Sequence, residues 1–248
     1  MYQLKSKVRY SEADFKSKLT HHALLNYLQD SSTLHSEELG ESGAQLLEKN
    51  MAWVFYKYDI KVNRYPKYGE KIKVVTMPKS FKKFYASRGY EIYDKNNEKI
   101  VEGEGIFLLI DIDKRRAIRI PEEQYIVYGI DIENCPDIKL TKLEKLTKEM
   151  NKNHFKVRYG DIDSNMHVNN VKYVEWAVES LPLEVILNYQ LEELSVIFEK
   201  ECRYGAEIIA SYEIKENESG LVILHKIVDN EDKELTVLIS KWKKLIEN

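Results

Sequence analysis

The sequence is poor in the residues that mark several large classes of protein. Its 248 residues include only 2 cysteines, 10 glycines and 5 prolines. Two cysteines, Cys135 and Cys202, are too few for a disulfide framework and lack a C-x-x-C spacing, which favours a reducing compartment. With so little glycine and proline and with 32% charged residues, we expect no long disordered segment.

The sequence also has no excess of one charge and no long apolar run. Its 38 Lys+Arg against 41 Asp+Glu give a formal net charge of −3, whereas proteins that bind nucleic acid through phosphate contacts normally have a basic excess. No window approaches the roughly 20 apolar residues of a membrane span, and the first residues contain no signal-peptide core. We therefore expect a soluble, cytoplasmic protein that neither crosses a membrane nor binds nucleic acid.

A motif near the N-terminus recurs 149 residues later. Residues 7–14 (KVRYSEAD) and 156–163 (KVRYGDID) share K-V-R-Y, an acidic residue and a final aspartate. Each copy leads into a segment with helical periodicity, for which Thr20 and Asn169 are the expected N-caps. The residues expected on one face of the first helix are Leu24, Tyr27, Leu28, Ser31 and Leu34.

Segments rich in β-branched and aromatic residues follow each helix and are predicted to be strands. They lie at 53–62, 72–76, 85–93 and 101–112, and at 194–202, 207–214, 221–228 and 235–242. One helix covers one apolar face of such a sheet, and a second copy in the same chain supplies a partner for the open edge. We predict a duplicated α+β fold with domains at 1–135 and 151–248. The expected linker, 136–150, lies within a connecting stretch at 121–150.

Only the second copy combines a carboxylate, an amide and an imidazole within five residues. Asp163, Asn165 and His167 stand at a strand-to-helix junction, whereas the first copy has D-F-K-S-K over 14–18. Such a junction offers unpaired backbone N–H groups and the positive end of a helix dipole, which can stabilise an oxyanion. From spacing alone, an ordinary polar loop that caps a helix remains an open alternative.

The run D-x-N-x-H-V-N-N-V-K-Y over 163–173 resembles the signature of the acyl–acyl-carrier-protein (acyl-ACP) thioesterases, the plant chain-terminating enzymes and their bacterial relatives. Further stretches that agree with this family lie at 53–54, 63–70, 91–94 and 198–202. In the last of them Glu199 replaces one of two basic residues. The resemblance spans nearly the whole chain and implies a tandem hotdog fold, each half a long central helix wrapped by an antiparallel sheet. Because no plant-type transit extension is present, we expect a bacterial type.

The resemblance implies hydrolysis of fatty acyl-ACP thioesters, with Asp163, Asn165, His167 and Glu201 as catalytic residues in the C-terminal hotdog. The thiol of a thioester leaves readily, so the demanding steps are activating water and stabilising the oxyanion. We expect Glu201 and Asp163 to flank and polarise the attacking water. Asn165 and His167 would hold it and donate to the carbonyl. Neither a cofactor nor a metal is expected.

The same resemblance assigns the N-terminal hotdog to binding of the acyl chain, without catalytic residues. Trp53 and Phe55 are the residues that we expect near the acyl tail. The expected partner, acyl carrier protein, is acidic, so the basic groups at 79–83 and 115–119 are candidate docking residues. A role in fatty acid biosynthesis follows from this reading, and a homodimer is left open.

Three alternatives stay open. Cys202 could act as a nucleophile with His167 and Asn165, although a strand cysteine is more often a small buried apolar residue. Glu201 and Cys202 would also point to opposite faces of a strand. An acyl-CoA thioesterase on the same fold would differ in recognition of its carrier. A non-catalytic acyl-binding sensor is the third alternative, since a fold does not determine a function.

Overall fold

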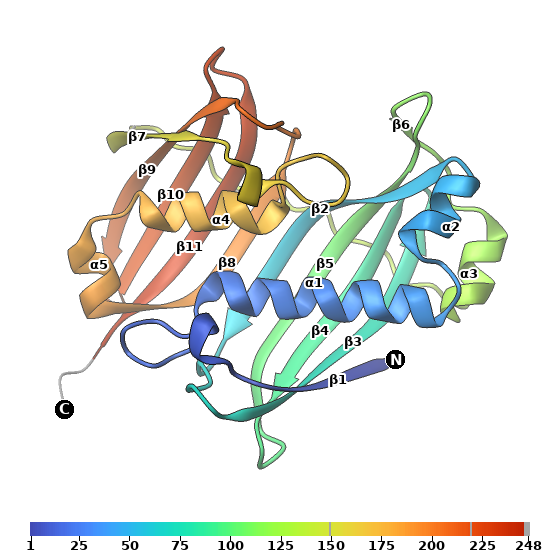
Figure 1. The fold of residues 1–248 in the computed structure, drawn as a ribbon, viewed down its shortest axis with the longest axis horizontal. Helices are drawn as coiled ribbons and strands as arrows, with labels where there is room; N and C mark the ends of the chain where they lie inside the picture. Colours follow the sequence, from blue (N-terminus) through green and yellow to red (C-terminus); the bar gives the residue numbers. More distant parts are fainter. Residues whose placement is uncertain (149, 219, 246–248) are drawn as a thin grey trace. The chain divides into compact units, whose positions relative to one another are not determined.

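The computed structural model describes residues 1–148, 150–218 and 220–245, which form two compact units. The N-terminal unit comprises Met1–Lys57 and Val62–Thr141, and the C-terminal unit comprises Tyr58–Lys61 and Lys142–Asn248. Each unit contains one long helix and an antiparallel sheet (Figure 1). None of the helices within the described ranges is long and apolar enough to cross a membrane.

The N-terminal unit is built around helix α1. Its elements are β1 (Tyr2–Lys7), a 3-10 turn (Tyr10–Glu12), α1 (His21–Glu38), α2 (Gly43–Glu48), β2 (Met51–Val62), β3 (Lys71–Lys82), β4 (Tyr85–Tyr93), β5 (Lys99–Asp111), β6 (Arg116–Ala117) and α3 (Glu122–Tyr128). The strands of its sheet follow the order β1-β3-β4-β5-β2, and β6 pairs with β5. Residues Tyr58–Lys61 of β2 belong to the C-terminal unit.

The C-terminal unit repeats this plan around the shorter helix α4. Its elements are β7 (Met150–Lys156), a 3-10 turn (Tyr159–Asp161), α4 (Asn170–Glu179), α5 (Leu183–Asn188), β8 (Tyr189–Phe198), β9 (Glu207–Asn217), β10 (Gly220–Asp229) and β11 (Glu234–Lys244). The strands follow the order β8-β11-β10-β9-β7. Both units therefore have the predicted succession of short strand, helix and antiparallel strands.

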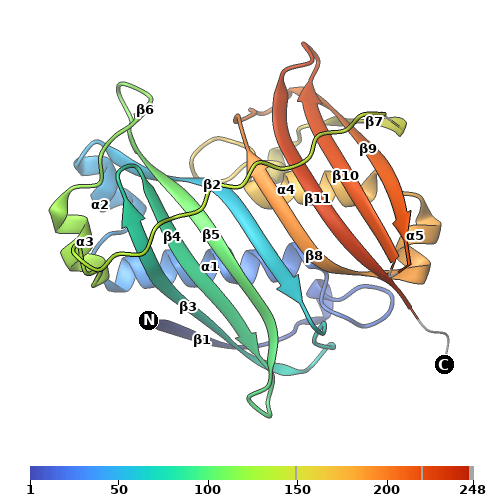
Figure 2. The same ribbon diagram turned by 180° about the vertical axis from the view of Figure 1, so that it is seen from behind.

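Each central helix lies against one face of its own sheet. The helices lie in front of the strands in Figure 1 and behind them in Figure 2. The inner face of α1 includes Leu24, Leu28 and Ser31, as the spacing predicts. Leu34 was wrongly placed on this face: it is 36% exposed, and His35 is buried instead. A helix advances 100° per residue, so position i+11 returns to the face of Leu24 while i+10 falls outside it.

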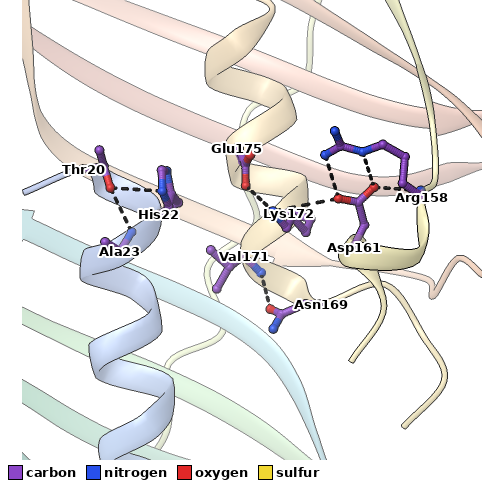
Figure 3. A network of polar contacts seen from close by, with 9 residues as sticks. All are labelled: Thr20, His22, Ala23, Arg158, Asp161, Asn169, Val171, Lys172 and Glu175. Atoms are coloured by element: carbon purple, nitrogen blue, oxygen red, sulfur yellow. Dashed lines mark hydrogen bonds and ion pairs between the residues drawn. The ribbon is translucent and has the colours of Figure 1, made fainter. Parts of the chain in front are cut away.

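Both predicted N-caps are confirmed. The hydroxyl of Thr20 accepts a hydrogen bond from the N–H of Ala23 at 3.3 Å, and the side chain of Asn169 accepts one from the N–H of Val171 at 2.9 Å (Figure 3). Each cap satisfies one of the N–H groups that the first turn leaves unpaired. The caps therefore determine where α1 and α4 begin, and with them where the loops before each helix end.

Two sequence expectations about secondary structure were wrong. Strand β8 ends at Phe198, so Glu201 and Cys202 lie in the loop before β9 and not on a strand. The N–H groups of Glu199 and Lys200 both donate to the carbonyl of Leu235, which closes the ladder at this point. Helix α3 also lies within the stretch at 121–150 that was read only as a connection.

Candidate active site

The loop between the second 3-10 turn and α4 is organised by the carboxylate of Asp163. One of its oxygens accepts hydrogen bonds from the N–H groups of Asn165, at 2.8 Å, and His167, at 3.4 Å. The N–H of Asp163 donates in return to the carbonyl of His167 at 2.8 Å. Met166 completes the turn with a φ of 63°, in the left-handed region. These bonds hold the side chains of Asn165 and His167 on one short, closed loop.

The loop after β8 brings Glu201 to the imidazole of His167. The Nε2 atom of His167 lies 3.3 Å from Oε2 of Glu201, with the two side chains 24% and 46% exposed. The N–H of Val168 donates to the carbonyl of Cys202 at 3.0 Å, which ties the two loops together beside this pair. A carboxylate and an imidazole therefore meet where solvent and a substrate can reach them.

A buried carboxylate anchors the same loops to α4 (Figure 3). Asp161, which is 1% exposed, accepts hydrogen bonds from the backbone N–H of Arg158 at 2.8 Å and from its guanidinium at 3.0 and 3.2 Å. Lys172 lies 3.9 Å from Asp161 and 2.8 Å from Glu175. Burial alone would raise the pKa of Asp161, but the bonds from Arg158 and the charge of Lys172 hold it below its ordinary value. Asp161 therefore stays ionised and joins the turn to the helix.

The N-terminal unit contains the same loop without the same side chains. Asp14 accepts hydrogen bonds from the N–H groups of Lys16 and Lys18 at 2.8 and 2.9 Å. The N–H of Leu19 donates to the carbonyl of Pro66 at 2.8 Å, as Val168 does to Cys202. In this register Lys16, Lys18 and Tyr65 take the places of Asn165, His167 and Glu201. At these loop positions the C-terminal copy therefore has an imidazole and a carboxylate, whereas the N-terminal copy has Lys18 and Tyr65.

The predicted site residues differ in the contacts that they make with one another. It brings His167 and Glu201 into contact and connects Asp163 to them through the backbone of His167. Asn165 is exposed on the same loop, and its backbone rather than its side chain bonds to Asp163. Whether both carboxylates meet one water stays a prediction.

Asp161 and Lys172 are not among the site residues predicted from the sequence. Asp161 takes the place that Glu12 holds in the first copy, where Glu12 accepts a hydrogen bond from the N–H of Arg9 at 2.8 Å. The acidic residue that both copies of the repeat share could therefore have indicated the structural role of Asp161.

Trp53 and Phe55 lie on β2 of the N-terminal unit, in aromatic surroundings. The ring of Trp53 packs 5.6 Å from that of Phe81 and 6.4 Å from that of Tyr128 in α3. Phe55 packs 4.5 Å from Phe107, edge to face. Both residues are only partly buried. Their contact with an acyl chain stays a prediction. Among the described residues no cluster of histidine, cysteine, aspartate and glutamate could hold a metal ion.

Cys202 is a poor nucleophile in this setting, and replacing it with alanine is expected to leave kcat within about twofold. The residue is 7% exposed, and burial raises the pKa of its thiol, so little thiolate is present at neutral pH. His167, the base that a cysteine triad would need, faces Glu201. Steady-state hydrolysis by Cys202→Ala checks this prediction. A loss of roughly 100-fold or more would restore the cysteine mechanism.

Models of one known protein family match both units of the chain. The family model for the acyl-ACP thioesterase N-terminal domain matches residues 1–128, and that for the acyl-ACP thioesterase C-terminal domain matches residues 144–244. An acyl-[acyl-carrier-protein] hydrolase of Cuphea viscosissima is 33% identical over 73% of this chain and 47% of its own length. A palmitoyl-acyl carrier protein thioesterase of Arabidopsis thaliana is 27% identical over 72% and 47%. The chain thus spans about half the length of the curated relatives it matches.

Solved structures show the same fold. A putative oleoyl thioesterase from Lactobacillus plantarum superposes with a TM-score of 0.91 at 24% identity, covering 99% of this chain and 97% of that one. The 12:0-ACP thioesterase from Umbellularia californica superposes with a TM-score of 0.87 at 21% identity, covering 98% and 97%. The expected tandem hotdog fold is thereby confirmed. With both family domains matched in order along the sequence, the chain belongs to the acyl-ACP thioesterase family.

Proposed function

We propose that the protein hydrolyses fatty acyl-ACP thioesters to free fatty acid and carrier protein. The observation that carries the proposal is the contact between His167 and Glu201, 3.3 Å apart, on two loops joined by the bond from Val168 to Cys202. Family membership supports the same reaction. The N-terminal copy of the loop, with its two lysines, lacks this pair.

The reaction needs one proton acceptor and one means of holding negative charge. Glu201, aligned by His167, removes a proton from water as the water oxygen attacks the thioester carbon, and such a base contributes about 10²–10⁴-fold. Donors on the 163–168 loop, the Asn165 amide and the His167 ring, stabilise the oxyanion. The tetrahedral intermediate then collapses, the C–S bond breaks, and the departing thiolate recovers the proton.

Incubation with acyl-ACPs of several chain lengths, followed by quantification of the fatty acids released, tests the proposal. The same acyl chains on coenzyme A should be hydrolysed with a lower kcat/KM. A higher kcat/KM for the coenzyme A thioesters would favour the acyl-CoA alternative. Intact thioester after prolonged incubation with every substrate would favour an acyl-binding sensor.

Four exposed cations near two hairpins of the N-terminal unit are the candidate docking residues for an acidic carrier. They are Lys83, Arg115, Arg116 and Arg119, which form no ion pair among the described residues. The N–H of Ile120 donates to the carbonyl of Lys83 at 2.7 Å, which holds the β3–β4 turn beside the segment 115–119 that carries the arginines. Lys79 and Lys82, by contrast, pair with Glu104 and Asp137. Of the two basic groups predicted from the sequence, we therefore keep only the four unpaired cations as candidate docking residues, and they form one patch.

Reversing two of these charges is expected to raise the KM for acyl-ACP. The double variant Lys83→Glu/Arg116→Glu should raise KM roughly tenfold at low ionic strength, with kcat unchanged, because complementary charge accelerates encounter. The effect should shrink in 0.5 M salt, where screening is strong. Lys95→Glu, an exposed reversal on the β4–β5 turn, is the matched control. Equal KM values for both variants would exclude this patch.

Three further expectations remain proposals. They are the binding of the acyl chain beside Trp53 and Phe55, a role in fatty acid biosynthesis, and a cytoplasmic location. The fatty acids released by the wild-type protein and by Trp53→Ala would test the first. A shift in preferred chain length is expected together with a lower melting temperature, because the indole packs in the aromatic cluster around Phe81 and Tyr128 and its removal leaves a cavity there.

A further inference from the structure

Tyr173 places a buried hydroxyl beneath the candidate active site. It stands on α4, one turn after the N-cap Asn169, and is 1% exposed. Its ring packs edge to face against Trp176, at 5.6 Å, and against Phe198, at 6.2 Å. Its hydroxyl has no hydrogen-bond partner among the described residues. A buried hydroxyl left without any partner costs stability, so a group of this kind needs an explanation, such as a functional role or a bridging water.

The geometry around Tyr173 points to the loop that carries Glu201. Its ring packs against Phe198, the last residue of β8, three residues before Glu201, and its helix begins just after Val168, whose N–H donates to the carbonyl of Cys202. Burial raises the pKa of Tyr173, and the thiol of Cys202 and the carboxylates of Glu201 and Asp163 raise it further. The backbone of Cys202 is close enough to oppose this shift, although no bond of normal geometry forms. The hydroxyl therefore keeps its proton at neutral pH and lies within electrostatic reach of both carboxylates of the site.

The N-terminal unit shows that the fold does not need a hydroxyl at this position. Tyr173 is four residues after the cap Asn169, and the residue four positions after the cap Thr20 is Leu24, which is 2% exposed. The central helix of that unit also has a tyrosine, Tyr27, but its hydroxyl donates to Glu12 at 2.8 Å. Of the two central helices, both within the described part of the chain, the one with an unsatisfied tyrosine hydroxyl is thus in the copy that has the imidazole and the carboxylate.

We propose that Tyr173 is a positioning residue whose hydroxyl holds the Glu201–Cys202 segment in the place where Glu201 meets His167. It contacts this segment from the helix side through one water, while the bond from Val168 to Cys202 holds it from the other loop. Its effect on turnover rests on the proposed hydrolysis. Its effect on the geometry of the pair does not.

Tyr173→Phe removes only the hydroxyl and tests the proposal. We expect kcat for acyl-ACP to fall roughly tenfold with KM within about twofold, because a small displacement of a catalytic group is costly. The melting temperature should change little, since the hydroxyl makes no hydrogen bond to another described residue of the fold. Tyr27→Phe is the matched control: it should lower the melting temperature and leave kcat unchanged. An unchanged kcat in Tyr173→Phe would overturn the proposal.

Two further measurements separate positioning from a general structural effect. If Tyr173 acts through Glu201, then Tyr173→Phe should add no further loss in a Glu201→Gln background; the full tenfold loss there would overturn the proposal. The ring NMR shifts of His167 should also move in Tyr173→Phe and stay in place in Tyr27→Phe. The NMR measurement does not depend on turnover. If the wild-type protein hydrolyses none of the substrates, the proposed function fails, and the His167 shifts still test whether Tyr173 positions Glu201. Identical His167 shifts in wild type and Tyr173→Phe would then overturn its positioning role.

Discussion

Glu201→Gln is expected to lower kcat for acyl-ACP by about 10²–10⁴-fold while the protein stays folded. The amide keeps the size of the side chain and can still contact His167, 3.3 Å away, but it cannot take a proton from water. KM should change little, because the carboxylate acts on the water and not on the carrier or the acyl tail. Steady-state kinetics, with the melting temperature as a check on folding, measures the effect.

The same loop supplies a matched control for this variant. Glu199 is exposed and lies two residues before Glu201, so Glu199→Gln removes the same charge from the same segment. We expect its kcat to equal that of the wild type. A comparable loss in both variants would mean that the charge of the loop matters and that Glu201 is not the base.

Asp163→Ala is expected to lower kcat by roughly 10²-fold or more and also to destabilise the protein. It removes a carboxylate from the site and the acceptor that orders the backbone of Asn165 and His167. Loss of such a local acceptor costs about 0.5–2 kcal/mol of unfolding free energy, and a misplaced imidazole lowers turnover further. Kinetics and thermal melting, measured on the same preparation, separate the two effects.

Asp14→Ala is the control, because Asp14 makes the equivalent bonds to Lys16 and Lys18 in the N-terminal unit. It should lower the melting temperature as Asp163→Ala does and leave kcat within about twofold. If Asp14→Ala lost as much activity, the role of Asp163 would be that of a structural loop residue alone.

Much of the fold can be predicted from local sequence patterns that occur in both copies of the internal repeat. Helix periodicity and the cap residues Thr20 and Asn169 placed α1 and α4 correctly, and the predicted strand at 85–93 has the bounds of β4. The short helices α2, α3 and α5, of six or seven residues, span too few turns for a periodic signal. They depend on packing within their own unit, as α3 does through Tyr128 and Phe81.

The sequence pattern predicts which residues to consider for the site, but it does not predict their geometry. The run from Asp163 to His167 is local, so its loop follows from one carboxylate and the N–H groups around it. Glu201 comes from a distant segment, and the prediction of a strand there failed because the ladder closes at Leu235. The alternation rule used to separate Glu201 from Cys202 therefore did not apply. Their separation comes from the bend of a loop and from burial, which leaves Glu201 46% exposed and Cys202 7% exposed.

A single-turnover experiment with enzyme in excess over acyl-ACP tests direct attack by carboxylate-activated water. Rapid quenching would follow the free carrier thiol and the free fatty acid in time, and mass spectrometry would follow the protein. We predict that the thiol and the fatty acid appear together at one rate, that the protein mass never changes, and that Glu201→Gln leaves the thioester intact. Release of the carrier ahead of the fatty acid, with an acyl group attached to the protein, would contradict this account.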